Sequence, residues 1–168
     1  MKVKLKKMHP DAVVPYKTHK LDFCYDCVAV SEEEVAPNVW KYGLGIALQI
    51  ERLWEVIGEY DEYGHHPEKN VWFDFKKLVG NLSIDARPRS SIWKTGMVLS
   101  NCEGTIDETY TGEVSAVFYH VMPNMPRYKV GDRVCQIKIG AALPMDFYVV
   151  DELNETDRGD GGYGSTGK

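Results

Sequence analysis

The segment 101–112 carries the residue types that could form a small ligand site. It reads Asn-Cys-Glu-Gly-Thr-Ile-Asp-Glu-Thr-Tyr-Thr-Gly and combines turn-forming residues with a central carboxylate, Asp107, and an aromatic ring, Tyr110. Because the flanking segments 97–99 and 114–121 are predicted to be strands, we expect a tight hairpin with Asp107 and Tyr110 at its tip. A carboxylate in such a place could orient and deprotonate a water molecule. Taken alone, Asp107 could equally be a turn residue that bonds to its own backbone.

The C-terminal stretch 157–168 is a second candidate for chemistry. It has five glycines and a single apolar anchor, Tyr163, so it cannot form a core of its own and we expect a flexible arm. Arg158, the hydroxyls of Ser165 and Thr166, and the backbone N–H groups near the glycines are what a phosphate chain needs from a loop that covers it. The residue order is not that of a Walker-type P-loop, and no helix follows.

The rest of the chain must position these two segments, and its pattern is that of short strands. Turn-forming Gly, Pro, Asn and Asp bound most apolar runs, which predicts a compact all-β barrel or double-sheet fold. The spacing leaves little room for the helical crossovers of a parallel sheet. We expect one domain over residues 1–156, followed by the arm. Strands are predicted at 3–5, 25–30, 39–49, 71–75, 82–86, 97–99, 114–121, 133–139 and 147–150.

One segment departs from the strand pattern and predicts a helix at about 50–60. Its apolar residues recur at helical spacing, and the opposite face carries charges. A helix that packs its apolar stripe on the barrel is the simpler interpretation, and a helix that docks a partner protein is the alternative. The apolar positions are Ile50, Leu53, Trp54, Ile57 and Tyr60.

Composition limits the classes of function. The 168 residues are 43% hydrophobic and 27% charged, with a formal net charge of −5, which is ordinary for a globular domain. The negative charge disfavours a general nucleic-acid coat. The sequence has no run of about 18 apolar residues and no signal-peptide pattern. We therefore expect a cytoplasmic protein with neither a membrane nor a nucleic-acid partner.

Cys24 and Cys27 form a Cys-x-x-Cys pair, which raises the question of a metal or redox site. No second pair lies at zinc spacing, and in an extended segment two residues three apart point to opposite faces of the sheet. We therefore expect reduced cysteines, not a zinc site.

Five motifs stand out in order along the chain. They are Phe-Cys-Tyr-Asp-Cys at 23–27, Pro-Arg-Ser-Ser-Ile at 88–92, the segment 101–112, Val-Gly-Asp-Arg-Val-Cys-Gln at 130–136, and Arg-Gly-Asp-Gly-Gly-Tyr-Gly-Ser-Thr-Gly at 158–167. Together they resemble the motifs of the homotrimeric dUTPases, the dUTP nucleotidohydrolases. One motif alone would be weak, whereas five in the family's order span nearly the whole chain. The chain departs from the family pattern at Phe23, Cys24, Ser91 and Thr111. Residues 51–80 have no counterpart in the minimal pattern and resemble an insertion.

The resemblance implies a distorted jelly-roll, or β-clip, barrel that assembles as a homotrimer with shared active sites. It also implies hydrolysis of dUTP to dUMP and pyrophosphate, by magnesium-assisted attack of a water molecule on the α-phosphate. By resemblance, Asp107 activates that water and bonds the sugar 3′-hydroxyl, while the ring of Tyr110 packs against the deoxyribose. The uracil edge is expected to be read by Asn101 and by the backbone of Gly104, Thr105 and Ile106.

The family's phosphate ligands map onto this chain in the same way. Arg89 is expected to bind the phosphates through charge-assisted hydrogen bonds, together with Ser90 and Ser91. Asp26 and Gln136 are expected to meet the magnesium only through water, because Mg²⁺ sits mainly on triphosphate oxygens and keeps several waters. Gln136 is also placed beside the phosphates.

By the same resemblance, the arm crosses to a neighbouring subunit. There Arg158 reaches the γ-phosphate and Tyr163 stacks on the uracil ring. The phosphates are covered by Gly164, Ser165 and Thr166.

Two alternatives stay open from the sequence. The dCTP deaminases and their bifunctional relatives share the fold and the Arg-Ser-Ser sequence found at 89–91, but they need a Glu acid–base at the hairpin and usually lack the Gly-Ser-Thr-Gly arm. The other alternative is a dUTPase with an added regulatory role, in which residues 51–80 form the surface for a protein partner.

Overall fold

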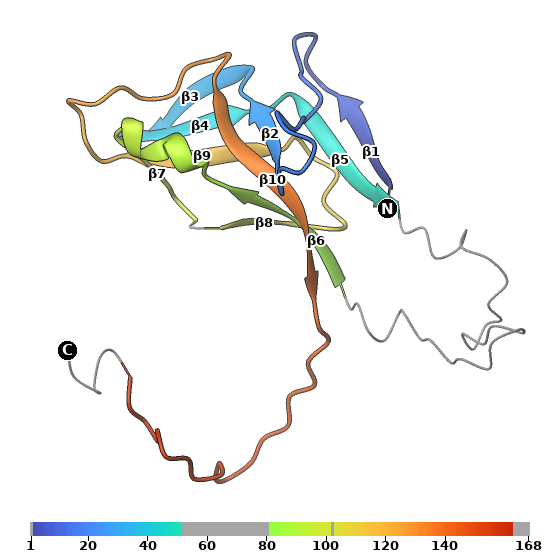
Figure 1. The fold of residues 1–168 in the computed structure, drawn as a ribbon, viewed down its shortest axis with the longest axis vertical. Helices are drawn as coiled ribbons and strands as arrows, with labels where there is room; N and C mark the ends of the chain where they lie inside the picture. Colours follow the sequence, from blue (N-terminus) through green and yellow to red (C-terminus); the bar gives the residue numbers. More distant parts are fainter. Residues whose placement is uncertain (1, 52–80, 102, 163–168) are drawn as a thin grey trace, which may run out of the picture.

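The computed structural model describes residues 2–51, 81–101 and 103–162, and in these ranges the chain is built mainly of β-strands (Figure 1). A five-residue 3₁₀ helix, η2, interrupts the strands. In chain order the elements are β1 (Lys2–Lys7), β2 (Tyr25–Val28), β3 (Ser31–Ala36), β4 (Val39–Gly43), β5 (Ile46–Glu51), β6 (Asn81–Arg87), η2 (Ser90–Lys94), β7 (Met97–Leu99), β8 (Gly104–Asp107), β9 (Ser115–His120) and β10 (Arg133–Ala142).

The strands form two four-stranded sheets and one two-stranded sheet, and every pairing is antiparallel. The first four-stranded sheet has the order β2-β10-β6-β8, the second β3-β4-β9-β7, and β1 pairs with β5. Apart from β3 and β4, neighbours in the two four-stranded sheets are not consecutive in sequence, as in a double-sheet jelly roll. The prediction of an all-β jelly-roll fold is confirmed.

Strand β6 shows how the sequence assigns the two faces of a sheet. Leu82, Ile84 and Ala86 alternate along it and are each at most 5% exposed, because they face the core. The intervening Ser83, Asp85 and Arg87 lie on the opposite face, and partners on β10 and β8 add further polar residues to it. The outer face of the β2-β10-β6-β8 sheet is therefore polar.

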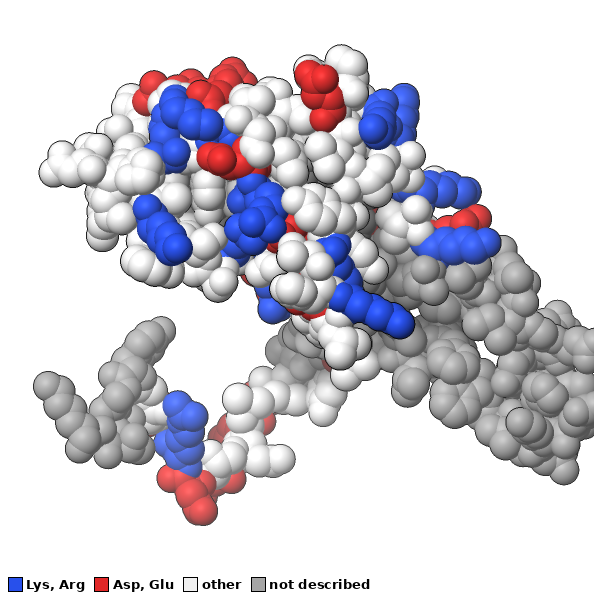
Figure 2. All heavy atoms as spheres, turned by 45° about the horizontal axis from the view of Figure 1, so that its top comes forward, with Lys and Arg blue, Asp and Glu red and all other residues white. Residues whose placement is uncertain are grey.

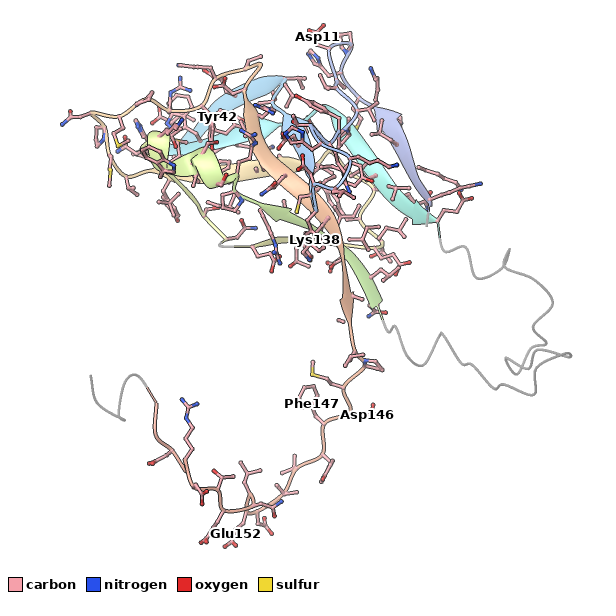
Figure 3. All side chains as sticks on the ribbon, viewed as in Figure 1. Asp11, Tyr42, Lys138, Asp146, Phe147 and Glu152 are labelled. Carbon is pink, nitrogen blue, oxygen red and sulfur yellow. The ribbon has the colours of Figure 1, made fainter. Side chains whose placement is uncertain are left out.

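The core between the sheets is centred on three aromatic rings. Tyr42, Phe118 and Tyr128 meet edge to face, with ring centroids 5.5 to 6.1 Å apart. The Tyr42 hydroxyl donates to the Tyr128 carbonyl at 2.9 Å, so its polar end is satisfied inside the body, where Figure 3 labels it. These contacts join β4 and β9 to the chain segment that leads into β10.

Gly45 divides the predicted strand 39–49 into β4 and β5. Its φ of 64° lies in the left-handed region, and a Cβ there would lie 2.7 Å from side-chain atoms of His9 and Val30. At this residue the chain leaves the sheet of β4 and enters the pairing with β1. Apolar patterning continues across the break, which is why the sequence alone predicts a single strand.

The predicted tight hairpin at 101–112 is wrong in its centre. Strands β7 and β9, which flank the segment, do pair antiparallel. Between them, however, Gly104–Asp107 form β8, which pairs with β6 at the edge of the other sheet. The turn follows the strand, with the Tyr110 amide donating to the Asp107 carbonyl at 3.0 Å.

Three other predicted elements also need comment. Residues 147–150 form no strand, and Val149 is fully exposed. The predicted helix at 50–60 is wrong at its start, because Ile50 and Glu51 belong to β5, where they pair with β1. Its remaining residues, and the predicted strand at 71–75, lie outside the described residues. β3 and η2 were not predicted.

The chain leaves the body after β10. Residues 143–162 run away from the sheets, with Asp146, Phe147 and Glu152 well clear of them (Figures 1 and 3). Figure 2 shows acidic and basic side chains of this segment standing apart from the body. Several large apolar side chains on it are exposed, among them Leu143, Met145, Tyr148 and Leu153 at 71–86%.

Within the part of the chain that the structure describes, no helix has the length and apolar character needed to cross a membrane.

Candidate functional site

A polar pocket of about 590 Å³ opens between the loop that precedes β2 and the strands β2, β6 and β10. Three arginines and two aspartates line it. The arginines suit it to an anionic ligand, and the aspartates offer hydrogen-bond acceptors for a metal ion that accompanies such a ligand. Its lining comprises Thr18, His19, Asp22, Phe23, Cys24, Asp26, Arg87, Arg89, Arg133 and Gln136.

Asp26 organises the charges of this pocket. Its side chain is only 11% exposed, and it accepts a hydrogen bond from Arg89 Nε at 2.8 Å on one oxygen. The other oxygen accepts from Arg133 Nη1 at 3.0 Å and from Arg89 Nη2 at 3.4 Å. A buried carboxylate needs such partners, and here it orients two guanidinium groups at once.

Gln136 lies beside Asp26 in one row across the sheet. The strand register pairs Gln136 with Asp26 on β2 and with Arg87 on β6. Side chains of directly paired residues lie on the same face, so all three point to the same side. Gln136 Nε2 donates to the Pro88 carbonyl at 3.2 Å, which holds the side chain next to the start of the Arg89 segment.

Arg89 stands in extended conformation immediately before η2, with φ −77° and ψ 153°. Pro88 precedes it, and the Ile92 amide donates to the Arg89 carbonyl at 3.0 Å, which closes the first turn. Arg89 Nη1 also donates to Ser91 Oγ at 3.2 Å. Ser90 is exposed at the start of the turn. The segment thus presents one guanidinium and two hydroxyls close together.

The proposed uracil reader is an edge strand, not a loop. In β8, Gly104 is buried, Thr105 and Asp107 are exposed, and Ile106 packs against the core. Asn101 lies over Gly104, since a Cβ on that glycine would be 3.2 Å from its side-chain nitrogen. Only β6 pairs with β8 among the described residues, so its other edge can offer backbone groups to a ligand.

Tyr110 is placed by the turn that follows β8. Its hydroxyl donates to the Glu113 carbonyl at 3.1 Å, and a Cβ at Gly112 would lie 2.5 Å from the Tyr110 oxygen. A larger residue at position 112 would have to displace the Tyr110 ring from this place. The ring stays 48% exposed and is available to a ligand.

The structure separates Asp107 from the polar pocket. Gln136 and Gly140 lie four residues apart on β10, Gly140 pairs with Ser83, and Ser83 pairs with Asp107. With about 3.4 Å per residue along a strand and about 4.8 Å between strands, Gln136 and Asp107 lie roughly 17 Å apart. Asn101, Asp107 and Tyr110 are accordingly not among the residues that line the pocket. One phosphate cannot contact both groups within a single chain.

Only the beginning of the predicted arm is described. Arg158 is exposed, and its Nε donates to the Gly161 carbonyl at 2.8 Å in a turn where Gly159 has a φ of 50°. Tyr163, Gly164, Ser165 and Thr166 lie outside the described residues.

Sequence reasoning missed several residues of the pocket. Arg133 belongs to the segment 130–136 and Arg87 directly precedes 88–92, so proximity to the motifs was the available signal. Thr18 contributes its hydroxyl, which accepts from Arg133 Nη1 at 3.3 Å. Whether an arginine next to a motif faces the pocket depends on the strand register, and this required the structure.

Three of the four cysteines lie among the described residues. Cys24, Cys27 and Cys135 are free, and the last two are buried and face each other across β2 and β10. The hydrogen bond with Cys135, together with burial, raises the pKa of the Cys27 thiol far above its ordinary value, so it stays protonated. Among the described residues, no group of three His, Cys, Asp or Glu side chains could hold a metal ion.

The chain is similar in sequence to known dUTPases. A family profile described as dUTPase matches residues 83–167. The deoxyuridine 5′-triphosphate nucleotidohydrolase of Picosynechococcus is 28% identical over 171 residues, covering 99% of each chain. The enzyme of the same name from Helicobacter pylori strain P12 is 29% identical over 168 residues, covering 99% of this chain and 97% of its own.

Solved structures share the fold. The Staphylococcus bacteriophage 80alpha dUTPase with dUpNHpp superposes with a TM-score of 0.66 at 17% identity and 99% coverage of each chain. The dUTPase of phage phi11 of S. aureus, described with a species-specific insert, has a TM-score of 0.62 at 15% identity, covering 93% of this chain and all of its own. Because the matching profile spans half of the sequence, from β6 to the arm, the chain belongs to the dUTPase family.

Proposed function

We propose that this chain hydrolyses dUTP to dUMP and pyrophosphate, as one subunit of a homotrimer. One observation carries the proposal: Asp26, Arg89 and Gln136, from three distant segments of a dUTPase-family chain, meet at a single polar pocket. Cleavage between the α- and β-phosphates requires neutralised phosphate charge and a water aimed at phosphorus. The pocket supplies the first requirement.

In this proposal the triphosphate binds where Arg89, Ser90 and Ser91 present their donors. A guanidinium fork matches phosphate geometry, and the bond from Arg89 to Asp26 sets the orientation of that fork before substrate arrives. Such preorganisation lowers the cost of ordering the side chain on binding.

Mg²⁺ fits this pocket through water. Both oxygens of Asp26 already accept from arginines, so they can reach a hydrated ion but cannot form a dedicated cage. Gln136 uses its amide nitrogen on Pro88, which leaves the amide oxygen as an acceptor for a metal-bound water. When bound to the triphosphate, the ion would neutralise charge that develops at the phosphates.

Asp107 is proposed as the group that orients and deprotonates the attacking water. Its carboxylate is exposed at the end of β8, beside the edge that offers backbone groups of Gly104, Thr105 and Ile106 to the uracil. A donor and acceptor pattern that matches uracil leaves buried groups unpaired with cytosine, which selects against dCTP. The exposed ring of Tyr110 would pack against the deoxyribose and leave no room for a 2′-hydroxyl.

Asp107 must act on a phosphate bound by another copy of the chain. The separation of about 17 Å within one chain, estimated from strand geometry, leaves each copy with two incomplete half-sites. The exposed apolar residues of 143–153 support the same conclusion, since such a segment is expected to be covered by a partner. A closed ring of three copies would complete every site.

The arm is proposed to close the site of a neighbouring copy. Arg158 would bind the γ-phosphate, Tyr163 would stack on uracil, and Gly164, Ser165 and Thr166 would cover the phosphates. The proposed partner surface at 51–80 lies almost wholly outside the described residues and stays a prediction.

Replacing Asp107 with Asn tests the role of this carboxylate. The variant should bind dUpNHpp with near-normal affinity, because the amide keeps the shape, yet lose at least about a hundredfold in kcat because the base is gone. Isothermal titration and pyrophosphate release would measure the two quantities. Near-normal turnover would refute the assignment of Asp107 as the base.

A further inference from the structure

Arg87 is a third arginine of the pocket, and neither the motifs nor the proposed function uses it. It ends β6 in direct register with Gln136, on the side of Gln136 opposite to Asp26. The three side chains therefore form one row, Asp26–Gln136–Arg87, across three strands of one sheet face. Gln136 is expected beside the phosphates and Asp26 near the waters of the magnesium ion, and Arg87 lines the same pocket.

The partner of Arg87 differs from the partner of the other two arginines. Arg89 and Arg133 both bind Asp26 inside the pocket, and together these groups carry one net positive charge. Arg87 Nε donates instead to Glu103, which lies outside the pocket lining, on the segment just before β8. The charge of Arg87 is thus held at the rim by a carboxylate that belongs to the base-reading segment.

This ion pair is weak enough to exchange. The side chains of Arg87 and Glu103 are 44% and 43% exposed. Solvent screens exposed pairs of this kind, so they contribute little to stability. A triphosphate carries more charge than one carboxylate and accepts from a guanidinium fork, so it competes well for Arg87.

Glu103 would not be left without a cation after such an exchange. Lys138 of β10, which Figure 3 labels, places its Nζ 4.0 Å from the Glu103 carboxylate. Lys138 also binds Asp85, which is buried. Burial raises the pKa of the Asp85 carboxyl, but hydrogen bonds from Lys138 and Ser83 outweigh the burial and keep the pKa below its ordinary value. Lys138 can therefore form ion pairs with two carboxylates, just as Asp26 forms ion pairs with two arginines.

We propose that Arg87 is a further phosphate-binding side chain, which Glu103 holds at the rim of the pocket and releases to the triphosphate. The identity of the nucleotide in this assignment rests on the proposed function, whereas the binding of phosphate by Arg87 does not. A purely structural Arg87–Glu103 clamp would predict equal effects of removing either partner. Release to phosphate predicts opposite effects.

The test compares Arg87→Ala with Glu103→Gln by titration of the full chain with dUpNHpp and Mg²⁺. Arg87→Ala should weaken binding about tenfold, as for loss of a charge-assisted hydrogen bond. Glu103→Gln frees Arg87 and should tighten binding at least about twofold. Lys4→Ala is the matched control, since it removes one cation from an exposed ion pair with Glu51 on β1 and β5 and should change nothing.

Weaker or unchanged binding by Glu103→Gln, or binding by Arg87→Ala within twofold of the parent chain, would overturn the proposal. Thermal melting of each variant shows whether it is folded, and Glu103→Gln decides the question even if Arg87→Ala does not fold. Inorganic tripolyphosphate is titrated in parallel. If the parent chain neither binds dUpNHpp nor hydrolyses dUTP, but tripolyphosphate binding still depends on Arg87, the proposed function fails and this inference stands.

Discussion

At the scale of single residues, the pocket depends on Asp26. It is nearly buried and binds two guanidinium groups, whose positive charges would repel each other without it. Asp26 therefore sets the position of Arg89 before any phosphate binds. The role proposed for Asp26 near a hydrated magnesium is secondary to this electrostatic one, because both of its oxygens are already engaged.

Replacing Asp26 with Asn should cost about 2–4 kcal/mol of folding stability, because a carboxylate partner is removed from two arginines in a partly buried site. Turnover of dUTP should fall at least about tenfold as Arg89 loses its orientation. Chemical denaturation and steady-state kinetics measure both. Asp11→Asn makes the same change on a side chain that is 85% exposed and should be neutral. Unchanged stability in Asp26→Asn would contradict the central place given to Asp26.

Sequence reasoning predicted Asp26, Arg89 and Gln136 through the motifs, and the structure brings them together. It did not predict Arg87 and Arg133, although both lie beside or within motifs. The reason is physical: in a strand, a shift of one residue moves a side chain to the other face, and the sequence does not state the register.

At the scale of elements, Gly45 and β8 show where local sequence patterns fail to predict the strands. Both lie where the chain passes from one sheet to another, and such passages are decided by pairing with strands distant in sequence. The residues of 101–112 have the composition of a turn, yet Gly104–Asp107 pair with β6, and that pairing overrides the local preference. An edge strand suits the proposed recognition of uracil better than a loop, because one row of its backbone groups is fixed and available.

One cluster ties the segment before β10 to the β3-β4 hairpin. Arg127 stacks over Trp40 with 3.5 Å to the ring centroid, and its Nη2 donates to Glu32 at 3.0 Å. The Val130 amide donates to the same carboxylate at 3.2 Å. The buried residues Tyr128 and Val134 lie next to this cluster in the sequence. The cluster therefore also helps to fix the start of β10, which carries Arg133 and Gln136.

This cluster predicts a pH dependence of stability. The hydrogen bond from Arg127 holds the pKa of the Glu32 carboxyl below its ordinary value of 4.5. A carboxyl with a lowered pKa in the folded state contributes stability that is present above the ordinary value and is lost as pH falls through the folded value. The stability difference between the parent chain and Glu32→Gln should therefore be largest near neutral pH and shrink below about pH 4.

Urea unfolding of the two chains at pH 7 and pH 3 measures this difference. Glu33→Gln, on the neighbouring exposed position, is the matched control. If the stability difference between the parent chain and Glu32→Gln were larger at pH 3 than at pH 7, the predicted direction of the pH dependence would be wrong.

At the scale of the whole molecule, the proposed site requires more than one copy of the chain. Its two half-sites face the same side of one sheet at a distance that a single triphosphate cannot span as proposed. Its C-terminal segment, 143–162, leaves the body with large apolar side chains exposed. The motifs predicted the arm, but the apolar run 147–150 was predicted as a strand, because a sequence pattern cannot show that a segment lacks its partner within one chain.

Two truncations should separate the roles of this segment. A chain that ends at Asp157 should assemble normally and lose most turnover, because Arg158 and the glycine-rich motif are removed. A chain that ends at Ala142 should also lose assembly, because Leu143, Phe147 and Val149 no longer cover a neighbour. Light scattering and dUTP turnover measure both effects. Normal assembly of the chain that ends at Ala142 would show that the apolar segment is not needed for assembly.

The central claim is that the chain hydrolyses dUTP and discriminates against dCTP. The most direct measurement incubates the purified chain with Mg²⁺ and dUTP, dCTP, dTTP or UTP in separate reactions and resolves the products by chromatography. The account predicts dUMP and pyrophosphate from dUTP, with the other three nucleotides essentially unchanged. Conversion of dCTP to dUTP or dUMP, with dUTP left intact, would contradict it.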